Sequence, residues 1–162
     1  MSNPGIIIQA RMGSSRLPGK IFMKYKDARL IDHIISQCKK TKLPVILAMP
    51  EADACKIGKR IETGPDALFF GSENDVIARY YWCAKEHKID PIIRVCADSK
   101  MIKSELILQQ LENYKKYKHT VYGNFCEIFS FKDLEYYYYH DKRPETREHV
   151  TMGMLQDMTV DY

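Results

Sequence analysis

The chain has 162 residues, of which 45% are hydrophobic and 28% charged, and its formal net charge is +4. A chain of this length buries roughly 70% of its unfolded surface, and 11% aromatic residues supply a core, which excludes disorder as the main state. No apolar run reaches the ~18 residues that span a bilayer, and residues 6–8 are too few for a signal-peptide core. We expect one compact domain over residues 1–162 that is cytoplasmic and has no membrane partner.

Cysteine usage and charge exclude further classes. The five cysteines are widely spaced and form no Cys-x-x-Cys pair, so neither a disulfide framework nor a zinc site is supported. Lysines and arginines are scattered, and the densest group, at 115–118, ends an expected helix where cations suit the helix dipole. This pattern favours a solvated surface over a nucleic-acid patch, and we expect no nucleic-acid partner.

Strands and helices alternate along the chain. Short apolar runs predict strands, apolar residues at helical spacing predict helices, and residues 10–20 predict a loop. Ser104 and Ser130 are the expected N-caps of the last two helices. In chain order the prediction is strand 6–8, helix 30–38, strand 44–48, helix 51–62, strand 68–70, helix 76–84, strand 92–95, helix 104–114, strand 127–129 and helix 131–140.

This alternation predicts an α/β fold in which helices cover both faces of a parallel sheet. Ligands of such sheets bind beyond the carboxyl ends of the strands. Four consecutive tyrosines, Tyr136 to Tyr139, must face all round their helix. Core and surface packing explains them, and a sugar- or partner-binding face is the alternative.

The loop at residues 9–20 follows the first strand and has the composition of an anion cradle. Gly13 permits close backbone approach, Ser14 and Ser15 add hydroxyl donors, and three cations follow one another closely: Arg11, Arg16 and Lys20. The spacing is not that of a P-loop, because Ile21 follows Lys20. Taken alone, the pattern favours a phosphate-binding loop and leaves a merely basic surface loop open.

Residues 9–20 closely resemble the signature of the sugar-activating cytidylyltransferases, the group of the CMP-sialic acid and CMP-KDO synthetases. The spore-coat polysaccharide branch typified by SpsF is the most similar. Residues 71–80, 93–98, 127–131, 147–151 and 159–161 resemble later blocks of that branch in the same order. The resemblance therefore extends over almost the whole chain.

The resemblance implies a Rossmann-like nucleotidyltransferase fold of the glycosyltransferase-A type, an α/β sandwich with a mostly parallel central sheet. The implied reaction transfers a cytidylyl group from CTP to a sugar or polyol (phosphate) acceptor and releases pyrophosphate, for surface polysaccharide biosynthesis. Catalysis of this kind is positioning and charge neutralisation, with Mg²⁺ bridging phosphate oxygens. Relatives often form homodimers, which the exposed aromatic stretch permits.

The resemblance also implies residue roles on the nucleotide side. The catalytic set is Arg11, Lys20 and Asp98. The expected metal ligands are Asp98 and Asp161. The alternative for Asp98 is an aspartate that stabilises a turn or caps a helix. The alternative for Asp161, the penultimate residue, is that it belongs to a frayed chain terminus and binds no metal. The expected nucleotide-binding residues are Gln9, Ala10, Arg11, Gly13, Ser14, Ser15, Arg16, Lys20, Gly71 and Ser72.

Arg147, Glu148 and His149 are the expected acceptor-binding residues, with Glu148 and His149 as an acid–base pair or, alternatively, the start of a surface helix. This side of the chain departs from the branch. Residues 99–101 replace its usual Cys-Pro-Leu, and the stretches at 117–127 and 150–159 are short. A nucleotide-binding module without turnover is therefore a second hypothesis, and an interaction protein of another class is a third.

Overall fold

The fold is built on one mixed sheet. The computed structural model describes residues 2–13, 16–118, 120–123 and 125–158. The sheet has six strands in the order β5-β4-β1-β6-β8-β7. The first four are parallel, β8 is antiparallel to β6, and β7 is antiparallel to β8. Their bounds are β1 Gly5–Gln9, β4 Val45–Pro50, β5 Ala67–Gly71, β6 Ile92–Cys96, β7 Val121–Tyr122 and β8 Glu127–Phe129. The expected α/β fold with a mostly parallel sheet is confirmed.

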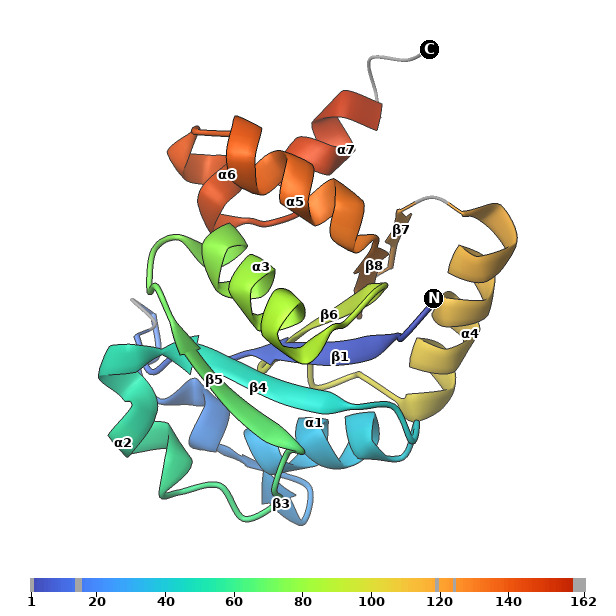
Figure 1. Cartoon of the computed structure of the whole chain (residues 1–162). Coiled ribbons are helices and arrows are strands. Elements are labelled where there is room, and N and C mark those ends of the chain that lie inside the picture. The colour runs from blue at the N-terminus through green and yellow to red at the C-terminus, as the bar shows by residue number, and fades with distance from the viewer. Residues whose placement is uncertain (1, 14–15, 119, 124, 159–162) are drawn as a thin grey trace.

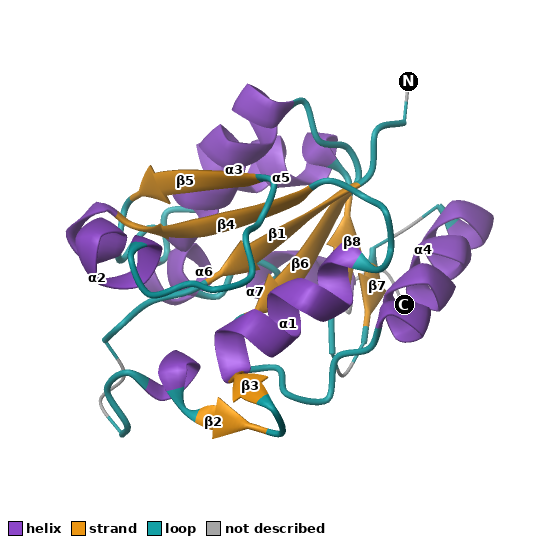
Figure 2. Cartoon of the chain, turned by 90° about the horizontal axis from the view of Figure 1, so that it is seen from below, coloured by secondary structure: helices purple, strands orange, loops and turns teal. Residues whose placement is uncertain are grey.

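Helices cover both faces of the sheet, as Figures 1 and 2 show. One face packs against α1 (Leu30–Lys39), α4 (Ser104–Tyr117) and the short α2 (Ala54–Gly58). The other packs against α3 (Val76–His87) and α5 (Phe131–His140), beside which lie α6 (Pro144–Glu148) and α7 (Met152–Met158). Two hydrophobic cores result, one on each side of the strands.

The first strand shows why its sequence is continuously apolar. Side chains alternate between the faces of a strand, and both faces here are covered. Ile6 and Ile8 belong to the core on the α1 side, whereas Ile7 belongs to the core on the α3 side, and all three are fully buried.

The strand order fixes where the chain reverses direction in the sheet. From β1 the chain steps outward to β4 and β5, then returns across the sheet through α3 to β6, which pairs with the free side of β1. Connections between parallel strands are right-handed. The connection through α1 runs from β1 toward one edge of the sheet and the connection through α3 runs from β5 back past β1, so the two helices lie on opposite faces. The boundary between β1 and β6 is therefore the switch point, where open α/β sheets bind ligands.

Some predicted elements differ in the structure. The helix expected over 51–62 is only η2 (Glu51–Asp53) and α2, because the buried Asp32 carboxylate accepts hydrogen bonds from the backbones of Glu62 and Thr63 and holds them outside a helix. Ser104 is the first residue of α4 rather than its N-cap, and its backbone N–H donates to Gln37 on α1. The expected cap at Ser130 is confirmed, since its hydroxyl accepts from the backbone N–H of Asp133.

The connection from β1 to α1 contains two small elements that the sequence did not predict. A 3₁₀ turn, η1 (Lys20–Phe22), is followed by a separate hairpin of β2 (Lys24–Tyr25) and β3 (Ala28–Arg29). Within the part of the chain that the structure describes, no helix has the length and apolar character needed to cross a membrane.

Candidate active site

A cavity of about 530 Å³ lies at the carboxyl ends of β1 and β6, which is the switch point of the sheet. This volume is within the range of small-molecule sites. The connection that follows β1, the start of α3, the end of β6 and the end of α6 all contribute walls. The expected nucleotide loop, Asp98 and part of the expected acceptor group therefore surround one cavity.

The loop after β1 folds back on itself to form one wall. The backbone N–H of Met12 donates to the carboxylate of Asp53 at 2.8 Å. Gly19 has a positive φ of 73°, which a glycine adopts without strain, and its N–H donates to the Met12 carbonyl. The loop residues that line the cavity are Gln9, Ala10, Arg11, Gly13, Arg16, Leu17 and Lys20. Ser14 and Ser15 lie outside the described residues.

Lys20 follows β1 and Asp98 follows β6, and the two side chains meet at the cavity. The ammonium of Lys20 is 3.6 Å from the carboxylate of Asp98, and about half of each side chain is exposed. An exposed pair of this kind contributes about 1 kcal/mol or less to stability. Neither group is therefore committed to the other.

Asp98 also fits the chemistry of a nucleotide-bound magnesium ion. Mg²⁺ retains several waters and uses one or two carboxylates together with substrate phosphates, rather than a cage made of protein groups. Asp98 lines the cavity beside the cationic loop, which is where such phosphates would lie. Among the described residues no cluster of three or more His, Cys, Asp and Glu could hold a metal by itself. Asp161, the other expected ligand, is outside the described residues.

A buried hydrogen-bond network orients Gln9 at the cavity floor. The amide oxygen of Gln9 accepts from Arg94 Nε at 3.0 Å and from the Tyr80 hydroxyl at 3.2 Å. Because a guanidinium only donates, the atom facing Arg94 must be oxygen. Arg94 in turn donates to Glu127 on β8 at 2.6 Å, and the Thr151 hydroxyl donates to the same carboxylate oxygen at 2.8 Å. The amide nitrogen of Gln9 is thereby left for a ligand.

Cys96 lines the same cavity but is not set up as a nucleophile. Burial raises the pKa of the Cys96 thiol, and the nearby Asp98 and Glu127 carboxylates reinforce this while Arg94 opposes it. The thiolate is the reactive form of cysteine. The Cys96 thiol therefore stays protonated at physiological pH, and the residue contributes only to the cavity wall.

The three expected acceptor-binding residues separate into two groups. Glu148 and His149, at the end of α6, line the cavity. Arg147 does not line it: the guanidinium donates to the carboxylate of Asp75 and to the Tyr138 carbonyl, at 2.7 and 2.6 Å. Arg147 thus ties α6 to the start of α3 and to the end of α5. Its position gives it a role in holding Glu148 and His149 in place.

Gly71 and Ser72 also lie outside the cavity lining. A Cβ at Gly71 would be 3.1 Å from the Arg79 side chain, so the missing side chain permits close packing of β5 on α3. The Ser72 hydroxyl accepts from the backbone N–H of Asp75, whose carboxylate caps α3. These residues shape the turn that leads into α3.

The sequence did not assign roles to Glu73, Arg79 or Arg94, yet all three line the cavity. One signal was present for Arg79. It is three residues after Val76, beside the apolar stripe of α3, where a charge is unexpected unless it has a ligand or partner.

Fold and site together define a nucleotidyltransferase-like architecture, and comparison with known proteins identifies the family. Residues 5–154 match the model of the cytidylyltransferase family, and the chain belongs to that family. The protein MJ1063 of Methanocaldococcus jannaschii is 32% identical over 90% of this chain and 64% of its own length. The spore coat polysaccharide biosynthesis protein SpsF of Bacillus subtilis is 31% identical over 62% of this chain and 45% of its own.

Two further similarities agree with this assignment. A 3-deoxy-manno-octulosonate cytidylyltransferase of Marinobacter nauticus is 27% identical over 75% of this chain and 48% of its own length. The solved structure of a cytidylyltransferase from Leptospira borgpetersenii superposes with a TM-score of 0.87 and 28% identity, covering 98% of this chain and 73% of that one. The chain spans between 45% and 64% of the length of these curated relatives.

Proposed function

We propose that this protein transfers a cytidylyl group from CTP to a sugar or polyol (phosphate) acceptor. An acceptor hydroxyl or phosphate oxygen attacks the α-phosphorus in line. The bond from that phosphorus to the bridging oxygen breaks, pyrophosphate leaves with the bonding electrons, and the proton of an attacking hydroxyl is lost. The observation that carries the proposal is the convergence of three loop cations and Asp98 on one switch-point cavity, in a chain of the cytidylyltransferase family.

The loop supplies charge neutralisation for the triphosphate. Arg11, Arg16 and Lys20 line the cavity and bring three positive charges to a ligand that becomes more negative at the leaving pyrophosphate. Lys20 releases Asp98 when phosphates bind, which frees the carboxylate for a cation. A bound Mg²⁺, held by Asp98 with phosphate oxygens and waters, would supply further charge neutralisation there.

The acceptor would contact the wall of the cavity that the end of α6 forms. Glu148 and His149 line that wall, and both are exposed, so they are free to contact the hydroxyls of a polar acceptor. We extend the proposal to a cytoplasmic role in surface polysaccharide biosynthesis because SpsF, by its name, serves spore-coat polysaccharide. We further propose a homodimer, because exposed aromatic side chains such as Trp82, 48% exposed, and Tyr139, 54% exposed, offer a contact surface.

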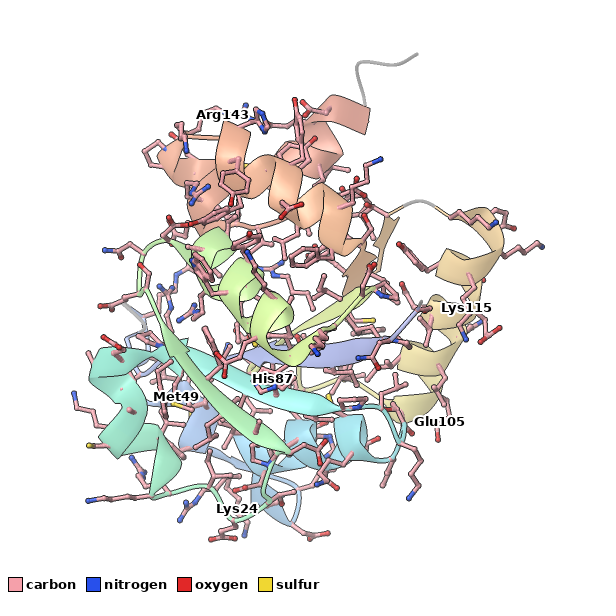
Figure 3. The ribbon with its side chains drawn as sticks, viewed as in Figure 1. Lys24, Met49, His87, Glu105, Lys115 and Arg143 are labelled. Carbon is pink, nitrogen blue, oxygen red and sulfur yellow. The ribbon has the colours of Figure 1, made fainter. Side chains whose placement is uncertain are left out.

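Pyrophosphate release is the direct test. Purified protein is incubated with CTP, Mg²⁺ and a panel of sugars, sugar phosphates and polyol phosphates, and released pyrophosphate is measured by an enzyme-coupled assay. We expect release with at least one acceptor, and a loss of at least 100-fold in Lys20→Met and Asp98→Asn. Lys24→Met is the matched control, because Lys24 is an exposed residue of the hairpin and does not line the cavity (Figure 3).

The alternatives give different results. CTP binding without pyrophosphate from any acceptor would indicate the nucleotide-binding module. Equal activity in Lys20→Met and the Lys24→Met control would refute the assigned site.

A further inference from the structure

A second concave surface, of about 320 Å³, lies on the α1 side of the sheet. Three segments that are distant in the sequence form it: the β2–β3 hairpin, one face of α1, and the loop that leads from β6 into α4. Its lining has no residue in common with that of the active-site cavity. We call it the lysine groove, after the four lysines that line it: Lys26, Lys40, Lys100 and Lys103.

Positive charge is concentrated in the lysine groove. The only carboxylate in its described lining is that of Glu105, in the first turn of α4 (Figure 3), although the formal net charge of the whole chain is only +4. None of the four ammonium groups forms an ion pair with a carboxylate in the part of the chain that the structure describes. Like charges that converge without counter-ions repel one another, so the groove favours an anion.

His33, on the α1 wall of the groove, senses this charge. Burial lowers the pKa of His33, and the ammonium groups of Lys26 and Lys40 lower it further. A neighbouring cation disfavours the protonated imidazole, so the effect indicates that these lysines act on the same small region. An anion bound among the lysines would offset their charge and raise the pKa of His33.

The groove also offers hydrogen-bonding groups to an uncharged part of a ligand. The amide oxygen of Gln37 accepts from the backbone N–H of Ser104 at 3.3 Å, which leaves the amide nitrogen free to donate. Tyr25 lines the groove and carries a hydroxyl, and the carboxylate of Glu105 can accept from hydroxyl groups. A ligand with both a phosphate and free hydroxyls would use all of these groups.

A phosphate monoester matches the groove in charge and size. At pH 7 it carries about −1.5 to −2 charges and three acceptor oxygens. Lysine is a common phosphate ligand, acting as a point charge. The volume of about 320 Å³ is near the lower end for small-molecule sites, which suits a phosphorylated sugar or polyol. A nucleic-acid strand would need a longer groove with several stacking aromatic side chains.

We propose that the lysine groove binds the phosphate monoester of a small polyhydroxylated molecule, such as a sugar or polyol phosphate, outside the active-site cavity. The lysines contact the phosphate, and Gln37 and Glu105 contact the hydroxyl groups. A single turn joins the two sites, because the N–H of Lys100 donates to the carbonyl of Asp98 at 2.8 Å. This inference does not rest on the proposed function.

NMR titration of His33 tests the inference, with inorganic phosphate, glycerol 3-phosphate and glucose 6-phosphate as probes. The resonances of His33 are assigned by comparison with His33→Gln, because the chain has five histidines. We expect the two esters to shift these resonances saturably and to raise the pKa of His33 by at least about 0.5. Their affinity is expected to fall about fivefold or more in Lys40→Gln and in Lys103→Gln, because each variant loses a charge-assisted contact with the phosphate.

Three further variants serve as controls. Lys132→Gln removes the same charge from an exposed side chain of α5, on the other face of the sheet, so affinity is expected to stay within about twofold. Lys20→Met should leave the titration unchanged, because Lys20 lines the cavity and not the groove. Glu105→Gln should reduce the preference for glucose 6-phosphate over inorganic phosphate, because a ligand hydroxyl loses its charged acceptor.

Several outcomes would overturn the inference. One is the absence of a saturable shift of His33 with either ester at millimolar concentration. Another is an equal loss of affinity in Lys132→Gln and Lys40→Gln, which would show a response to net charge alone. Loss of the titration in Lys20→Met would place the phosphate in the active-site cavity instead.

Two other kinds of partner are tested in parallel. Vesicles containing phosphatidic acid present the same phosphate monoester on a membrane, and single-stranded RNA presents phosphodiesters. Binding of either one that Lys40→Gln and Lys103→Gln weaken, without a response to the soluble esters, would overturn the assignment to a small soluble ligand. None of these measurements depends on CTP turnover, so failure of this inference and failure of the proposed function are distinguishable.

Discussion

The pair formed by Arg94 and Glu127 gives the most quantitative prediction about stability. The N···O distance is 2.6 Å, and the two side chains are only 13% and 24% exposed. Burial alone would lower the pKa of Arg94, but Tyr80, Cys96 and Glu127 together raise it, so the guanidinium stays charged. Glu127→Gln leaves that buried charge without its counter-ion. Removing one partner of a buried pair costs roughly 3–5 kcal/mol, and we expect about 3 kcal/mol because some exposure remains.

This loss has a direct thermal readout. For a domain of this size 1 kcal/mol corresponds to about 2–4 °C in Tm, so Glu127→Gln should melt about 6–12 °C below the wild type. The double variant Glu127→Leu/Arg94→Met should recover part of the loss, because an apolar pair needs no counter-ion. A decrease of less than about 2 °C in Glu127→Gln would refute the reasoning. So would a double variant whose loss of Tm equals the sum of the losses measured for Glu127→Leu and Arg94→Met alone.

Three further predictions concern other parts of the molecule. Arg79→Met should melt about 2–4 °C above the ligand-free wild type, since it removes an unpaired buried charge; a lower Tm would show that Arg79 has a stabilising partner. Hydrogen bonds from Arg143 hold the pKa of the Asp141 carboxyl well below its ordinary range, against the opposing effect of burial, so Asp141→Asn should be less stable at pH 7. That difference, measured by urea unfolding, should shrink as the pH falls below about 4. A carboxyl whose pKa is lowered by folding contributes its full stability above the unfolded-state pKa and progressively less as the pH falls toward the folded-state pKa; a pH-independent difference would contradict this. Iodoacetamide at pH 7.5, followed by mass spectrometry, should label the exposed Cys55 well before Cys96, because burial raises the pKa of the Cys96 thiol. Equal labelling rates would contradict the conclusion that Cys96 is a protonated, unreactive thiol.

The layered fold was predictable because it depends on patterns that are local in sequence. Uninterrupted apolar runs such as residues 6–8 can be buried only between two helical layers, and the stripe of α3 is complete in the sequence. The prediction of a helix over 51–62 was wrong because the carboxylate of Asp32, far away in the sequence, accepts hydrogen bonds from the backbone N–H groups of Glu62 and Thr63. Such tertiary hydrogen bonds leave no local signal.

The candidate site was predictable on the loop side and less so elsewhere. Residues 9–20 form one continuous segment, so their composition already indicates an anion site. Arg147 looks from sequence like its neighbours Glu148 and His149, but its partner, Asp75, becomes adjacent only after folding. In the same way, the two unpaired N–H groups of Arg79 are recognised only once the chain has folded.

Nucleotide binding tests the central claim most directly. The melting temperature is measured with CTP, UTP, ATP or GTP, each with and without Mg²⁺, for the wild type, Lys20→Met and Lys24→Met. A ligand at 100 times its Kd stabilises a protein by about 2.7 kcal/mol, which is a shift of roughly 5–10 °C here. The account predicts such a shift for CTP, strengthened by Mg²⁺, in the wild type and Lys24→Met but not in Lys20→Met. No shift with any nucleotide in the folded wild type, or an equal shift in Lys20→Met, would contradict it.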